Sequence, residues 1–189
     1  KYRKLLEEHG MYLLQNDLFY KNEFDDMGII PYAELEQMTN AELTERLRCS
    51  RLVVFGGTGF SGCNVEFNAN NGIYWNTVDR ETEIQESKKF DNLYQKLLPV
   101  LDQKNTVIFT HTPQKDWSSN PKSHAKFVYV SGHTHRNVFY DDGEERIYAD
   151  NQIGYHNNNP RLKNFLMDWE YDYFSDYEDG IYEITAQAY

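Results

Sequence analysis

Short apolar runs that end in turn residues alternate with charged, amphipathic stretches along this chain. The runs Arg51–Phe55, Thr106–Phe109 and Phe127–Val130 predict buried strands. Six of their residues are expected in the core: Val53, Phe55, Val107, Phe109, Val128 and Val130. Arg80–Gln103 between the first two runs carries an apolar stripe at helical spacing, although Pro99 should kink or end that helix. A helix between two buried strands predicts crossover connections and therefore the α/β class.

The two ends of the chain contribute further elements to this prediction. Helices are predicted over Tyr2–His9, closed by Gly10, and over 33–48. Strands are predicted over Met11–Tyr20 and Gly180–Thr185, and a hairpin is predicted from Val138–Tyr140 and Arg146–Tyr148. Thr39 and Glu42 fit a capping box that begins the second part of the helix over 33–48. Segment 156–179, rich in Asn, Asp and aromatic residues, is expected to be a partly irregular surface excursion.

Candidate chemistry lies where two of the predicted strands end. His111 follows the strand over Thr106–Phe109, and His133 and His135 follow the strand over Phe127–Val130 in Gly132-His133-Thr134-His135. Residues at i and i+2 of an extended chain lie on the same side, so both imidazoles of the second block can reach one cavity. Ligands of α/β proteins bind outside the carboxyl ends of the strands. These histidines are therefore candidates for one polar site.

The blocks FTHTP and SGHTHRN, with 22 residues from His111 to His133, resemble the last two metal-binding blocks of the calcineurin-like metallophosphoesterases. RLVVFGGTGFSG at 51–62 and RIYADNQIGY at 146–155 resemble core strands of that family more weakly, and Thr110 stands where the family more often has glycine. The resemblance implies an α/β fold with mixed β-sheets sandwiched by helices. It also implies two divalent metal ions (Mn, Zn or Fe). His111 and His133 would share one ion, and His135 would bind the other.

The function that the resemblance implies is metal-dependent hydrolysis of a phosphomonoester or phosphodiester substrate. Three earlier blocks of the family, Asp-x-His, Gly-Asp-x-x-Asp and Gly-Asn-His-Asp/Glu, do not occur in these 189 residues. We therefore expect residues 1–189 to be the C-terminal portion of a metallophosphoesterase domain, with the upstream half and the remaining metal ligands before Lys1. On this interpretation the intact parent is the enzyme, and the 189-residue chain by itself is a poor catalyst.

Two alternatives stay open at the level of sequence. One is a non-catalytic scaffold with the phosphoesterase fold that binds partners through its surface. The other is a mononuclear site in which three histidines leave a fourth position open. The glycine-rich turn at 56–62 is interpreted as structural, because its spacing fits neither a dinucleotide-binding fingerprint nor a P-loop. His9, His124 and His156 are interpreted as ordinary surface or core residues.

Net charge and cysteine content limit the binding partners and the cellular compartment that we expect for this chain. The net charge of −11 disfavours nonspecific binding to nucleic acid or to an anionic membrane. Bound metal ions can reverse the local field, so a phosphate-bearing substrate is not excluded. Cys49 and Cys63 are expected to be reduced thiols of a cytoplasmic protein. The sequence has no apolar run of transmembrane length, and it does not indicate an oligomeric state.

Overall fold

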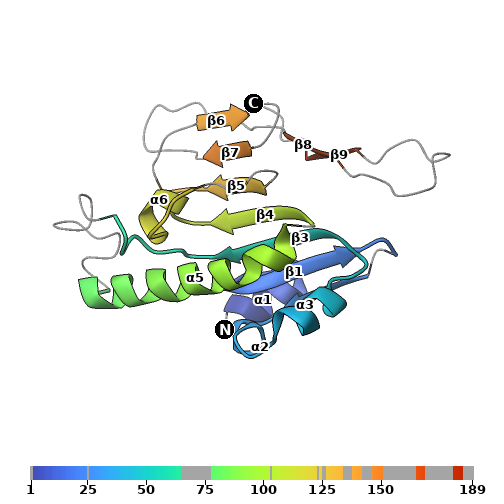
Figure 1. The fold of residues 1–189 in the computed structure, drawn as a ribbon, viewed down its shortest axis with the longest axis horizontal. Coiled ribbons are helices and arrows are strands. Elements are labelled where there is room, and N and C mark those ends of the chain that lie inside the picture. Colours follow the sequence, from blue (N-terminus) through green and yellow to red (C-terminus); the bar gives the residue numbers. More distant parts are fainter. Residues whose placement is uncertain are drawn as a thin grey trace.

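A seven-stranded mixed β-sheet organises the chain (Figure 1). The structure is a computed structural model that describes residues 2–24, 26–64, 78–102, 104–122, 124, 127–133, 138–141, 146–150, 165–168 and 181–184. The helices are α1 (Tyr2–Glu8), α2 (Tyr32–Leu35), α3 (Asn40–Arg46), α5 (Arg80–Leu101) and α6 (Gln114–Trp117). The strands are β1 (Asp17–Asn22), β2 (Met27–Ile30), β3 (Ser50–Gly57), β4 (Asn105–Thr110), β5 (Phe127–Ser131), β6 (Val138–Asp141), β7 (Arg146–Asp150), β8 (Phe165–Asp168) and β9 (Ile181–Ile184).

The strand order of the large sheet is β2-β1-β3-β4-β5-β7-β6, and β8 pairs with β9 in a separate two-stranded sheet. The central pairs β3–β4, β4–β5 and β5–β7 are parallel, and hairpins β1–β2 and β6–β7 add antiparallel strands at the two edges. Helix α5 connects β3 to β4, as a parallel pair requires. The structure therefore confirms the predicted α/β class, the mixed sheet and the hairpin over 138–148.

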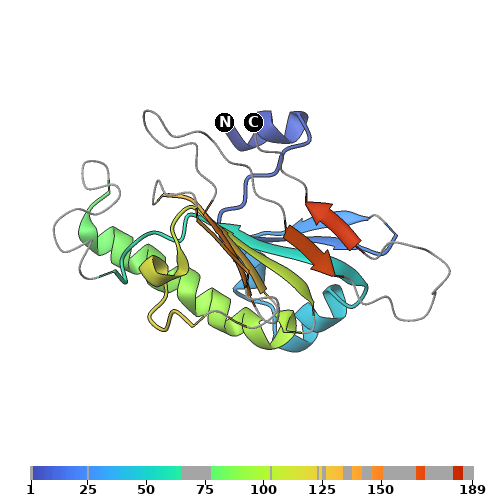
Figure 2. The ribbon, with the colours of Figure 1, turned by 90° about the horizontal axis from the view of Figure 1, so that it is seen from above.

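One face of the sheet packs against α2, α3, α5 and α6, and this interface forms the main core (Figure 2). Helix α5 places Phe90, Tyr94 and Leu97 against this face, and all three are almost fully buried. The Phe90 ring stacks on Phe55 of β3 with 4.6 Å between ring centroids. Trp117 of α6 meets the Phe90 ring edge-on at 4.8 Å. The apolar stripe predicted for α5 thus forms its buried side.

The opposite face of the sheet carries a smaller apolar cluster of Leu52, Val54, Val107, Val128 and Val130. Figure 2 shows α1 on this side of the sheet. Helices thus pack against one face to form the main core, and the predicted sandwich of the sheet between helical layers stays a prediction. Phe109 is 53% exposed, so its predicted burial is wrong. Alternation along β4 turns Thr106 and Ile108 toward the main core and Phe109 away from it, toward the smaller cluster's side.

The N-terminal strand prediction is wrong in its boundaries. Residues 11–14 are irregular, and β1 begins only at Asp17, directly after Asn16, whose φ of +63° interrupts an extended chain. The helix predicted over 33–48 is two helices, α2 and α3. Thr39 and Glu42 do form the predicted capping box at the start of α3. The predicted helix over Tyr2–His9 is α1, and Gly10 follows it with a φ of +70°.

Pro99 does not end α5. The helix continues to Leu101, and the Asp102 N–H donates to the Leu98 carbonyl at 3.0 Å. Pro99 and Gln95, whose carbonyl loses its helical donor, are both exposed, so water can replace the missing hydrogen bond. Within segment 156–179 the structure has β8, and the rest of that segment lies outside the described residues. No helix in the described ranges is long and apolar enough to cross a membrane.

Candidate functional site

The carboxyl ends of the four parallel strands form one row at one edge of the sheet. Gly57 of β3 lies opposite Thr110 of β4, which lies opposite Ser131 of β5, which lies opposite Asp150 of β7. His111 and His133 follow two neighbouring members of this row. The edge is therefore the place where the sequence predicted a site.

Backbone hydrogen bonds join the segments that leave these strands. The His111 N–H donates to the Gly57 carbonyl at 3.2 Å, and the Gly132 N–H donates to the His111 carbonyl at 3.0 Å. A Cβ on Gly132 would lie 3.7 Å from His111 Nδ1, so the imidazole sits directly beside the Gly132 backbone. The exits of β3, β4 and β5 are thus connected in a single chain of contacts through His111.

The two described histidines of the predicted site are neighbours in space. The ring centroids of His111 and His133 are 5.2 Å apart, with an angle of 62° between the ring planes. His111 is exposed and His133 is partly buried, so both rings are within reach of a ligand from solution. His135 lies outside the described residues. The structure brings His111 and His133 together, and metal binding by them stays a prediction.

The glycine-rich turn after β3 packs directly against the segment that carries His111. Thr112, which is fully buried, donates from Oγ1 to the Phe60 carbonyl at 2.7 Å, and its N–H donates to the Thr58 carbonyl at 3.2 Å. Gly59 has a φ of +78°, and a Cβ there would lie 2.6 Å from Thr112 Oγ1. On its other side, Ser87 of α5 donates to the Gly59 carbonyl at 3.1 Å. These contacts give the turn a structural part at this edge, where it supports the His111 segment from one side.

Backbone strain in the described residues is concentrated at this edge. The non-glycine residues with positive φ are Asn16 (+63°), Phe60 (+63°) and His133 (+68°). Asn16 precedes β1, which runs antiparallel to β3, so all three lie where the parallel strands end. Positive φ is uncommon for residues other than glycine, and such strain collects at functional sites. His133 is therefore not in the extended conformation from which the sequence analysis placed His133 and His135 on the same side of the chain.

The nearby buried carboxylates have partners of their own. Asp17 pairs with Arg3 at 2.7 Å, and Asp91 accepts from the Ser119 hydroxyl at 2.7 Å. Asp116 accepts from the Asn64 side chain at 2.6 Å, and burial raises the pKa of the Asp116 carboxyl. Across the described ranges, no group of three or more His, Cys, Asp and Glu side chains is placed to hold a metal ion.

The structure describes two of the three other histidines and both cysteines. His9 is exposed at the end of α1, and His124 lies 3.3 Å from the Asp102 carboxylate, while His156 lies outside the described residues. Cys49 and Cys63 are free thiols, and burial raises the pKa of Cys63.

Sequence reasoning missed the part that Gly57 and Thr58 play at the site, where their carbonyls hold the His111 segment. Their position after a parallel strand was the signal that could have found them.

The chain matches no protein-family model. Comparisons with curated proteins and with solved structures also find no match. The family named from the two histidine blocks therefore rests on those residues alone.

Proposed function

We propose that this chain supplies the C-terminal histidine ligands of a calcineurin-like metallophosphoesterase, which hydrolyses a phosphomonoester or phosphodiester. The observation that carries the proposal is the approach of His111 and His133, with ring centroids 5.2 Å apart at the carboxyl edge of the sheet. Both residues belong to the blocks that resemble the family, and they reach this edge from two adjacent parallel strands.

The residues present fit a divalent metal ion in chemistry and position. Imidazole nitrogen is a good ligand for Zn, Mn and Fe, and two accessible rings side by side can share one ion. His111 and His133 would hold that ion, and His135 would hold a second. When bound, such ions supply charge neutralisation on phosphoryl oxygens and acidify water, so that hydroxide is available at neutral pH.

The chain's own contribution is to position the two imidazoles. The hydrogen bonds from His111 N–H to Gly57 and from Gly132 N–H to His111 fix the backbone on which both rings stand. Among the described residues, no group of three or more His, Cys, Asp and Glu side chains is placed to hold a metal ion, so the proposal does not assign the carboxylate ligands. The proposal therefore concerns hydrolysis by the complete site, and metal binding by this chain.

Metal titration of the 189-residue chain tests the proposal. Binding of Zn²⁺ or Co²⁺, followed by competition with a chromogenic chelator, should weaken at least about tenfold in His111→Ala and in His133→Ala, since each removes a ligand. His124→Ala is the matched control and should leave the affinity unchanged. Equal affinity in all three variants would show that the metal binds elsewhere and would contradict the proposal.

A further inference from the structure

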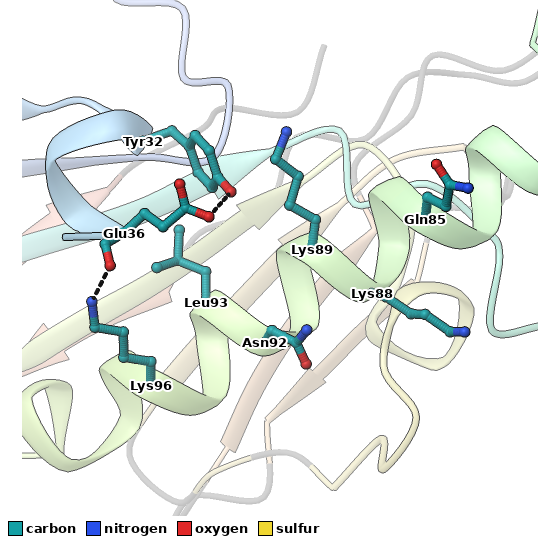
Figure 3. Close-up of a pocket in the computed structure, with 8 residues that line it drawn as sticks. All are labelled: Tyr32, Glu36, Gln85, Lys88, Lys89, Asn92, Leu93 and Lys96. Carbon is teal, nitrogen blue, oxygen red and sulfur yellow. Dashed lines mark hydrogen bonds between the residues drawn. The ribbon is translucent and has the colours of Figure 1, made fainter.

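A groove lies between α2 and α5, on the helical layer that packs against the sheet (Figure 3). Its volume is about 410 Å³, and its lining is Tyr32, Glu36, Gln85, Lys88, Lys89, Asn92, Leu93 and Lys96. Three of these side chains are lysines and one is a carboxylate. This local excess of positive charge occurs in a chain whose net charge is −11.

Two of the three lysines are held in place by α2. Lys96 Nζ donates to the carbonyls of Leu35 and Glu36 at 2.7 and 2.9 Å, which satisfies carbonyls at the end of that helix. Lys89 Nζ lies 4.5 Å from the centroid of the Tyr32 ring, a cation–π distance. Because these side chains are already ordered in the free protein, less conformational entropy is lost when a ligand binds.

The positive charges of the groove are incompletely compensated. The Glu36 carboxylate accepts from the Tyr32 hydroxyl at 2.7 Å rather than pairing with a lysine. Lys89 meets Glu86 at 3.7 Å, an ion pair exposed enough to be weak. Lys88 makes no hydrogen bond or ion pair with any residue in the described ranges. Of the three lysines, Lys88 is therefore the one whose ammonium has no partner in the described ranges, and Lys89 has a weak one.

The remaining lining adds an amide donor and an apolar surface. Asn92 stands on the α5 side of the groove, and Leu93, which is 5% exposed, lies between it and the Tyr32 ring (Figure 3). The Tyr32 hydroxyl donates to Glu36, and burial and this hydrogen bond raise the pKa of Tyr32 to about 12, so Tyr32 offers the ligand the face of its ring. Donors beside an apolar wall suit a ligand with an anionic head and a small apolar body.

We propose that the α2–α5 groove binds a small organic phosphate monoester, with its dianionic head at Lys88, Lys89 and Asn92 and its body against Tyr32 and Leu93. A phosphate dianion has the charge and the acceptor oxygens to take several charge-assisted hydrogen bonds. The apolar part of the lining, the Tyr32 ring and Leu93, favours an organic ester over inorganic phosphate. This inference does not depend on the proposed hydrolysis.

Titration of the 189-residue chain with phenyl phosphate, followed by amide NMR in EDTA at constant ionic strength, tests the groove. We expect saturable shifts at Tyr32, Asn92 and Leu93, with a dissociation constant on the order of 1 mM. The double variant Lys88→Gln/Lys89→Gln should weaken binding about fivefold or more, since exposed charge pairs are individually modest. Lys4→Gln on α1 is the matched control and should bind as the native chain does.

Three outcomes would overturn the inference. The first is the absence of saturable shifts at the groove, and the second is equal weakening in Lys4→Gln, which would indicate general charge attraction. The third is shifts confined to the strand edge that disappear in His111→Ala, which would place the phosphate at the histidines. Retention of groove binding in His111→Ala supports the inference, whatever the fate of the proposed hydrolysis.

Discussion

Asp116 of α6 is an aspartate that the fold keeps 4% exposed, and its main compensation is a hydrogen bond from Asn64. Burial raises the pKa of this carboxyl, while Asn64 and Lys115 lower it. A raised pKa in the folded state means that the folded chain holds this proton more tightly than the unfolded chain does. The group therefore favours folding below its unfolded pKa of about 3.9, and that contribution is lost as the pH rises through the folded pKa.

Asp116→Asn should remove this pH dependence, because an amide oxygen can still accept from Asn64 but carries no charge. We expect the variant to gain stability relative to the native chain as the pH rises from about 3 to about 7. Denaturant unfolding across that range measures the difference. Glu7→Gln, at an exposed position of α1, is the control. A difference between Asp116→Asn and native that stays constant with pH would contradict the assignment.

Strand β4 presents its alternate residues to two different environments. Val107 is 7% exposed on the face with the smaller cluster, and Phe109, two residues later on the same face, is 53% exposed. The same face thus changes from covered to open toward the carboxyl end of the strand. In β4, the position of a side chain along the strand therefore predicts its contribution to stability better than its size does.

Val107→Ala should destabilise the chain by about 1–3 kcal/mol, through lost transfer free energy and a cavity. Phe109→Ala removes a larger side chain, yet we expect it to cost less than about 1 kcal/mol because half of the ring already faces solvent. The free energies of unfolding of the two variants, measured in urea, provide the comparison. A larger loss in Phe109→Ala than in Val107→Ala would mean that something covers Phe109.

Much of the element pattern was predictable because local signals and long-range packing agree. The crossover through α5, the strands β3, β4 and β5, and the capping box at Thr39 all follow from apolar spacing and capping residues. The apolar letters of Met11–Leu14 predicted a strand because composition does not reveal the turn at Asn16. The exposure of Phe109 depends on what faces the sheet, and alternation within a short apolar run does not encode that.

The candidate site was predictable in its location and less so in its construction. Histidines after parallel strands indicate a common edge, and the structure places His111 and His133 there. The positive φ of His133 and the support from Thr112 arise from contacts between loops distant in sequence. The α2–α5 groove was not predicted, because its lysines are spread along α5 and lie beside α2. The sequence analysis treated α2 and α3 as one helix.

At the scale of the whole molecule, the proposed function requires carboxylate and asparagine ligands besides the three histidines. We expect the chain alone, with Mn²⁺ or Zn²⁺ added, to hydrolyse an aryl phosphodiester slowly or not at all, because imidazoles leave the charge of the metal ions uncompensated. A longer chain that restores the aspartate and asparagine blocks should be active, and His133→Ala and His135→Ala should each abolish most of its turnover. The measurement is the hydrolysis rate against added metal.

Two comparisons make that experiment decisive. His124→Ala and His156→Ala in the longer chain should leave the rate within a factor of a few, since the proposal gives neither residue a part in metal binding. Full activity of the longer chain after removal of metal, or in His133→Ala, would contradict the metallophosphoesterase mechanism. The non-catalytic scaffold would then be the better description.

The hydrogen bonds that run from Gly132 to His111 and from His111 to Gly57 have a consequence for binding thermodynamics. Because the main chain beneath both imidazoles is ordered when the sheet folds, a ligand that both rings bind does not have to order that backbone itself. Only rotation about the side-chain bonds is left to restrict. Affinity at this edge should therefore rise and fall with the stability of the β3–β4–β5 pairing, even for substitutions that never touch the ligand.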